Sequence, residues 1–147
     1  MNRPLRLVAA LALLAGPPTA LPAPALKEPK NDLSKLEGEW KVESWVQFGR
    51  PIAMTATWSF KGDKYTLDMR TNPEEGTIAL GQAKTPATID LAITGGGCAG
   101  KDQPGIYKLD GDTLTCCFAW PGVAERPTEF ASTAANRWIL VTLKRAK

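Results

Sequence analysis

Side chains that commonly carry out chemistry are scarce in this chain. Its 147 residues include no histidine and only three cysteines. Without histidine, a Ser-His-Asp triad cannot form and a cysteine nucleophile lacks its usual base. The commonest zinc ligand is also missing, and three cysteines without further ligands at suitable spacing do not predict a metal site. We therefore expect no enzyme, no cofactor and no metal centre.

The cysteines are candidates for a disulfide. Cys116 and Cys117 are adjacent on a predicted strand and point to opposite faces, which argues against a bond between them. Cys98 lies in a loop that leads into the partner strand of the same hairpin. We predict a Cys98–Cys117 disulfide, with Cys117 on the outer face and Cys116 packed inside as a small hydrophobe. Three unpaired thiols are the alternative.

A glycine-rich segment offers a second chemistry. Residues 95–101 fit the G-x-x-x-x-G-K pattern of a phosphate-binding loop. However, Asp102 stands where a Mg²⁺-binding Ser or Thr is required, and its carboxylate would repel a phosphate. Gln103-Pro104-Gly105 prevents the helix whose N-terminus holds the anion. The segment is therefore interpreted as a loop and not as a nucleotide site.

Asp90 is the carboxylate that a turn does not explain, because it interrupts the apolar sequence Ile89-Asp90-Leu91. Strand alternation accounts for it as a solvent-facing residue. If it faced inward, its pKa would rise and it would become an acidic candidate site. An enzyme that uses Asp90 or a free thiol is the alternative to a non-enzymatic protein.

Residues 1–25 have the pattern of a signal peptide. Two arginines precede an uninterrupted apolar run from Leu7 to Ala15, and Ala23-Pro24-Ala25 offers small residues for cleavage. The run is about half of the ~20 residues that cross a bilayer, so a membrane anchor is the weaker alternative. We expect cleavage near Ala25, export to the periplasm or beyond the cell, and no membrane span in the mature chain.

The net charge supports no electrostatic partner. The formal charge is +3, and the predicted signal peptide carries two arginines and no acids, so the mature chain carries +1. Such a small charge gives no strong attraction to nucleic acid or to anionic membranes. We expect no nucleic-acid partner.

The remaining sequence has the period of β-strands. After a flexible leader at 26–31, a helical turn through Leu33 and Leu36 ends at Gly38. From there to the end of a domain spanning 32–147, apolar residues alternate with polar ones. The expected strands are 40–48, 52–60, 65–69, 78–80, 89–93, 106–109, 112–120 and 138–143.

These strands are expected to close into an all-β, antiparallel, up-and-down barrel of about eight strands. The short connections require antiparallel pairing, and closure buries the apolar faces without leaving edges. A two-sheet sandwich would satisfy the same pattern. Asp110-Gly111 predicts a type I′ hairpin in which Tyr107 lies opposite Leu114.

Some segments resemble a known family. Gly38-Glu39-Trp40 matches the Gly-x-Trp signature of lipocalin-like barrels, which implies that Trp40 plugs one end and that Arg145, or failing it Lys144, stacks on its ring. The ordered set 36–40, 105–115 and 126–130 resembles a secreted lipocalin-like family of unknown function that is expanded in planctomycete bacteria. The resemblance implies a barrel and export, but no reaction.

The same family pattern has one cysteine at the end of the hairpin strand. Cys117 occupies that position, whereas Cys98 and Cys116 are departures from the pattern.

Aromatic residues are the remaining candidates for function. Most are expected to face inward, and the five that we predict as ligand-binding residues are Trp58, Phe60, Tyr65, Tyr107 and Phe118; Trp40, Phe48 and Trp138 are the other inward-facing candidates. In an eight-strand barrel such rings either line a pocket or fill the core.

Two functions follow from these alternatives. The first is a binding module for a small apolar molecule held in the barrel. The second is a protein-interaction or inhibitor module with a packed core, whose loops around 94–104 and 121–130 meet an envelope protein.

Overall fold

The computed structural model describes residues 31–147. The predicted signal peptide, and the predicted leader up to residue 30, lie outside the described residues. Within them, no helix is long and apolar enough to cross a membrane. From residue 31 onward, one short helix is followed by nine strands: α1 (Asp32–Leu36), β1 (Gly38–Gln47), β2 (Arg50–Pro51), β3 (Thr57–Lys61), β4 (Lys64–Asp68), β5 (Glu74–Gly81), β6 (Thr88–Gly95), β7 (Asp102–Asp110), β8 (Thr113–Phe118) and β9 (Ile139–Arg145).

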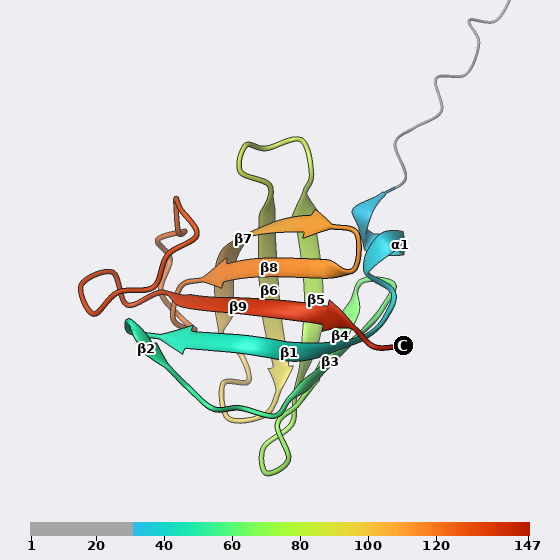
Figure 1. Ribbon diagram of the computed structural model, residues 1–147, viewed down its shortest axis with the longest axis horizontal. Coiled ribbons are helices and arrows are strands. Elements are labelled where there is room, and N and C mark those ends of the chain that lie inside the picture. The colour runs from blue at the N-terminus through green and yellow to red at the C-terminus, as the bar shows by residue number, and fades with distance from the viewer. Residues whose placement is uncertain (1–30) are drawn as a thin grey trace, which may run out of the picture.

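Eight of these strands form a closed antiparallel barrel (Figure 1). From β3 to β9 each strand pairs with the next one along the chain, and β1 pairs with β3 on one side and with β9 on the other. The two-residue strand β2 adds only to the end of β1. The predicted up-and-down, lipocalin-like barrel is therefore confirmed, and the two-sheet sandwich is excluded because the β1–β9 ladder removes both sheet edges.

Strand alternation places the core inside this barrel. In β3, Trp58 and Phe60 are buried between less buried neighbours, and in β4 Tyr65 and Leu67 are buried between exposed residues. The predicted strand at 52–60 is wrong in its first half, because β3 begins only at Thr57. Residues 52–56 cross from the β1–β2 hairpin to β3. Their alternating residue types resemble a strand, but a strand also needs a neighbouring strand to pair with, which alternation does not predict.

A bulge in β1 changes which of its side chains face the interior. The register against β9 shifts by one residue between Val42 and Ser44, and such an extra residue re-aims the side chains that follow it. Trp45 consequently packs against the core. Phe48, predicted to face inward, instead has a φ of 53° and lies with its ring centroid 5.4 Å from that of Trp120. The prediction that Phe48 faces inward is wrong, because its backbone has left β1 and its ring packs against Trp120.

The β7–β8 hairpin forms where predicted, but in a different register. Asp110 pairs with Thr113, and Tyr107 therefore lies opposite Cys116 instead of Leu114. Gly111 is the first central residue of the turn, with a φ of 57°. A type I′ turn needs positive φ at both central residues, and Asp112 is not among the residues with positive φ. The observed register differs from the predicted one by two residues. Because side chains alternate with a period of two, Tyr107 still lies on the same face as Cys116.

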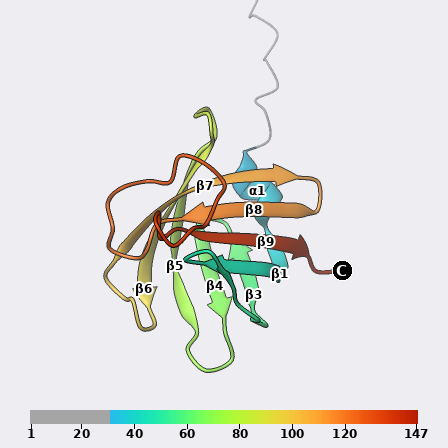
Figure 2. The same ribbon diagram turned by 60° about the vertical axis from the view of Figure 1, so that its left-hand side comes forward.

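One end of the barrel is closed by α1 and Trp40. The Trp40 indole is fully buried, and its Nε1 donates a hydrogen bond of 2.8 Å to the Leu36 carbonyl. The Arg145 guanidinium lies 4.3 Å from the Trp40 ring centroid and donates to the carbonyls of Glu37 and Lys35. The predicted cation–π plug is confirmed. Figure 2 shows α1 and the C-terminus on the side away from the long β8–β9 connection.

Candidate ligand-binding site

Aromatic rings fill much of the barrel interior. Trp58 lies at the centre of a cluster in which its ring centroid is 5.7 Å from Phe60, 6.0 Å from Tyr65 and 5.7 Å from Phe118. All four side chains are at most 3% exposed. Pairs at these separations stabilise the fold beyond the area that they bury. Most of the interior is therefore packed core.

Two glycines make room for these rings. A Cβ on Gly76 would lie 2.8 Å from Cε1 of Tyr65, and a Cβ on Gly105 would lie 2.5 Å from Cδ1 of Phe118. Real Cβ atoms essentially never approach other atoms so closely. The glycines on β5 and β7 therefore allow large rings to lie flat against the barrel wall.

A small cavity lies at the end of the barrel opposite the Trp40 plug. It has a volume of about 200 Å³, and its lining includes residues from the end of β1, the end of β8 and the start of β9. We name this space the inner cavity. Its lining residues are Trp45, Gln47, Met54, Trp58, Leu67, Met69, Glu74, Cys98, Gln103, Phe118, Trp120, Pro121 and Ile139.

Two of the five predicted ligand-binding residues, Trp58 and Phe118, line the inner cavity. The other three are buried in the barrel interior, as predicted, but do not line this cavity. Phe60 packs within the core, and Tyr65 turns its hydroxyl toward Glu74. Tyr107 points to the plugged end, where its hydroxyl donates to Asp32 at 2.7 Å. Alternation predicts that a side chain faces the barrel interior, but it does not predict where along the barrel axis that side chain lies.

Polar groups at the inner cavity come from three elements. The Tyr65 hydroxyl donates to Oε1 of Glu74 at 2.8 Å. Burial raises the pKa of Glu74, although the Tyr65 hydrogen bond opposes that rise, and burial together with the Glu74 charge raises the pKa of Tyr65 well above its usual value. Gln103, buried on β7, donates from Nε2 to the Ala119 carbonyl at 2.9 Å. The Glu74 carboxylate and the amides of Gln103 and Gln47 thus interrupt an otherwise largely apolar lining.

One polar atom in this region has no protein partner. Trp58 Nε1 is buried and, among the described residues, is the only buried side-chain nitrogen or oxygen without a hydrogen bond. Leaving such a donor unpaired costs about 1–3 kcal/mol.

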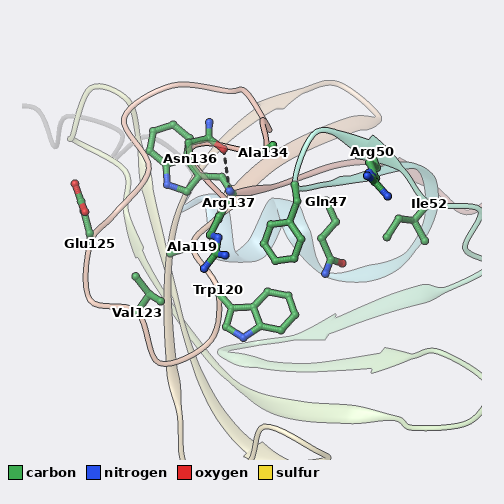
Figure 3. Close-up of a pocket in the computed structure, with 12 residues that line it drawn as sticks. Gln47, Arg50, Ile52, Ala119, Trp120, Val123, Glu125, Ala134, Asn136 and Arg137 are labelled. Atoms are coloured by element: carbon green, nitrogen blue, oxygen red, sulfur yellow. Dashed lines mark hydrogen bonds between the residues drawn. The ribbon is translucent and has the colours of Figure 1, made fainter.

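A second, larger depression lies outside the barrel end. This outer groove has a volume of about 750 Å³ and shares Gln47 and Trp120 with the inner cavity. In Figure 3, Val123 and Glu125 border it on one side, Arg50 and Ile52 on the other, with Trp120 between them. Trp120 is 42% exposed and Val123 45%, so apolar surface faces solvent here.

Trp138 also lines the outer groove and not the barrel interior. Its predicted inward direction is wrong because β9 begins only at Ile139, so Trp138 still belongs to the loop.

Sequence reasoning missed the residues that surround the inner cavity. Trp45 and Gln47 follow the β1 bulge, whose only trace in the sequence is the break in alternation at 44–45. Trp120 was expected to continue a strand that in fact ends at Phe118. Glu74 lies before the strand expected at 78–80, whereas it is the first residue of β5. Gln103 lies before the strand expected at 106–109, whereas β7 already begins at Asp102.

The predicted Cys98–Cys117 disulfide is wrong, because all three cysteines are free. Cys117 does lie on the outer face, but the β8–β9 connection covers it, and its Sγ donates to the Ala131 carbonyl at 3.4 Å. Cys98 lies on the other side of the wall, at the inner cavity. Cys116 is fully buried in the core as predicted, and burial raises the pKa of both adjacent thiols.

The other two chemical candidates are explained by the fold. Asp90 is a solvent-facing residue of β6, as predicted, and forms an ion pair with Arg126 at 2.8 Å. The glycine-rich segment connects β6 to β7, and the strand that follows it contains Gln103 and Pro104. No helix N-terminus is present there to hold a phosphate.

Comparison of the chain with family models, with curated proteins and with solved structures found no match. Membership of the planctomycete lipocalin-like family therefore remains a prediction from the sequence motifs. The arguments for function come from the barrel and its inner cavity.

Proposed function

We propose that this chain is an exported, lipocalin-like barrel that binds a small, largely apolar molecule in the inner cavity. The observation that carries the proposal is the lining itself: nine of its residues present mainly apolar surface, among them Trp45, Met54, Leu67 and Phe118. A concave apolar wall with a few polar groups is the usual form of a small-molecule site.

The size of the inner cavity limits the ligand. At about 200 Å³ it is smaller than the roughly 300–1,000 Å³ of sites that hold drug-sized molecules. A single substituted aromatic ring or a short aliphatic chain suits this space. Trp120 touches both the inner cavity and the outer groove, so a longer ligand would extend past this ring into the groove.

Two features of the sequence favour export, although the barrel fold itself does not require it. The signal-peptide pattern at 1–25 and the family resemblance both favour a protein that meets its ligand outside the cytoplasm.

The proposal is tested with the protein purified after expression of the full chain. Mass spectrometry of solvent extracts is expected to reveal a retained small molecule, and titration calorimetry is expected to detect saturable binding of a small aromatic probe such as indole. Met69→Trp, which adds bulk at the cavity, should remove both signals. Thr66→Trp, which places the same side chain on the outer face of β4, should leave them unchanged.

A folded protein that retains nothing and shows no saturable response to indole would contradict the proposal. So would equal responses from the Met69→Trp and Thr66→Trp variants.

The exposed apolar residues of the outer groove favour the second candidate, a protein-interaction module. Ile52, Trp120 and Val123 are 38–45% exposed and all line that groove. In this case the loop around 121–130 would meet an envelope protein. Replacing Val123 and Ile52 with serine should then remove a captured partner without altering indole binding. Unchanged capture would dismiss this candidate.

A further inference from the structure

The lining of the inner cavity contains an acidic side chain but no basic one. Glu74 is its only ionisable carboxylate, and neither lysine nor arginine lines it. Among the described residues Glu74 takes part in no ion pair. The Tyr65 hydroxyl bonds to Oε1, and no described residue donates a hydrogen bond to Oε2. A half-buried carboxylate with a free oxygen is thus the strongest electrostatic feature of the cavity.

The surroundings of Glu74 are those that attract an organic cation. The rings of Trp45, Trp58 and Trp120 line the same small space, and the faces of tryptophan rings carry negative potential. Met54 and Met69 add polarisable sulfur atoms. A cation that enters receives attraction from the carboxylate and from the rings together, whereas an anion meets repulsion.

We propose that the ligand of the inner cavity carries an ammonium head group, and that Glu74 and the surrounding tryptophans recognise it. The inference rests on the proposed function, and adds the chemical class of the ligand: a small aromatic or aliphatic amine. Its apolar body contacts Leu67, Phe118 and Ile139, and its ammonium group donates to Glu74 Oε2.

Neutralising Glu74 also removes an energetic cost of the unliganded protein. Burial disfavours the charged carboxylate, and a cation at hydrogen-bond distance restores part of the lost solvation. An alcohol of the same shape would donate a hydrogen bond to Glu74 without supplying charge. Comparing an amine with that alcohol therefore isolates the contribution of the charge.

The experiment measures the affinity of four matched probes by calorimetry: 2-phenylethylamine, 2-phenylethanol, phenylacetate and ethylbenzene. We expect the amine to bind about tenfold more tightly than the alcohol, which corresponds to a combined charge and cation–π contribution of about 1.4 kcal/mol. Phenylacetate should bind most weakly. Glu74→Gln keeps an acceptor for the Tyr65 hydroxyl and should reduce the preference for the amine to the smaller part that the tryptophan rings supply.

Glu75→Gln is the matched control, because the neighbouring Glu75 is exposed on β5 and does not line the inner cavity. It should leave the preference for the amine unchanged. Thermal melts of both variants establish that they are folded.

Three outcomes overturn the proposal. Equal affinity of the wild-type chain for amine and alcohol, or a preference for the amine that survives undiminished in Glu74→Gln, would exclude Glu74 as a cation receptor while leaving ligand binding in place. A folded wild-type chain that binds none of the four probes and retains no extracted molecule would exclude the proposed function as well. Because the first comparison uses the wild-type chain, it decides the matter even if a variant fails to fold.

Discussion

At the scale of single residues, Arg145 shows how one side chain ties distant segments together. Its guanidinium lies over Trp40 at 4.3 Å and donates to the carbonyls of Lys35 at 2.6 Å and Glu37 at 3.0 Å. The carbonyls belong to the segment that ends α1, so the C-terminal strand holds the N-terminal helix against the plugged end of the barrel. The planar, multidentate form of arginine suits this arrangement better than the single ammonium of lysine.

We expect Arg145→Ala to lower the free energy of unfolding by about 2–4 kcal/mol, because a cation–π contact, two charge-assisted hydrogen bonds to carbonyls and an ion pair with Asp112 are lost. Arg145→Lys should recover only part of this loss. Urea denaturation of the three proteins measures the differences. A lysine variant as stable as the wild type would show that charge alone, without the guanidinium geometry, holds the plug.

Glu74 has a predictable effect on the pH dependence of stability. Burial raises the pKa of Glu74 in the folded protein, so the folded state holds its proton more tightly than the unfolded state does. Stability is therefore lost as pH rises from the ordinary carboxyl pKa through the raised one, and it is regained on acidification through the same range. The titratable groups that face Glu74 are Tyr65 and Cys98.

Glu74→Gln should consequently be more stable than the wild type at pH 7, and the difference should shrink as the pH falls toward the ordinary carboxyl pKa. Unfolding free energies of the two proteins at a series of pH values test this. A difference that stays constant with pH would mean that Glu74 is not destabilised by burial.

At the scale of elements, departures from regular strand geometry decide what reaches the inner cavity. The β1 bulge turns Trp45 inward, and the close approach at Gly105 lets the Phe118 ring lie against β7. Without these two irregularities, the same strands would present different side chains to the interior. Irregularities of this kind are common where a strand must re-aim a side chain.

Gly105→Ala should destabilise the barrel by about 1–3 kcal/mol, the usual cost of overpacking a core. The added Cβ would lie 2.5 Å from Phe118 Cδ1 and 2.8 Å from the Cys117 carbonyl, and the carbonyl belongs to a paired strand that cannot move freely. Gly97→Ala is the control: its Cβ would meet only the end of the Asn72 side chain, at 3.0 Å. Thermal melts compare the two variants, and equal melting temperatures would contradict the expected clash.

At the scale of the whole molecule, the barrel depends on closure between its first and last strands. β9 pairs with both β1 and β8, and it buries Ile139, Val141 and Leu143. Pairing of segments that are about a hundred residues apart in the sequence carries a loop-closure cost that favours slow, cooperative folding.

A chain that ends at Asn136 should therefore lose its fixed tertiary structure, because removing β9 exposes the interior along two ladders. A chain that lacks only Lys147 should melt like the full protein. Near-ultraviolet circular dichroism, which reports fixed aromatic packing, distinguishes the two. A native spectrum from the shorter chain would show that the other seven strands form a stable sheet by themselves.

Local patterns were sufficient to predict the architecture. Alternating side chains at Trp58, Phe60, Tyr65 and Leu67 define an inner and an outer face, and short connections require antiparallel neighbours, so an up-and-down barrel follows from the sequence. The Trp40–Arg145 plug was also predictable, because the motif resemblance places one residue on the first strand and the other on the last.

The tertiary structure decided which inward residues meet empty space. Periodicity of two specifies the face on which a side chain lies, but it carries no information on depth along the barrel axis; Tyr107 and Phe118 share a face, yet only Phe118 lines the inner cavity. Three cavity residues depend on such details: Trp45 is turned inward by the β1 bulge, and Glu74 lies at the start of β5. Gln103 lines the cavity because closure of the barrel brings β7 to it. Such positions depend on pairing between residues far apart in the chain, which no local pattern records.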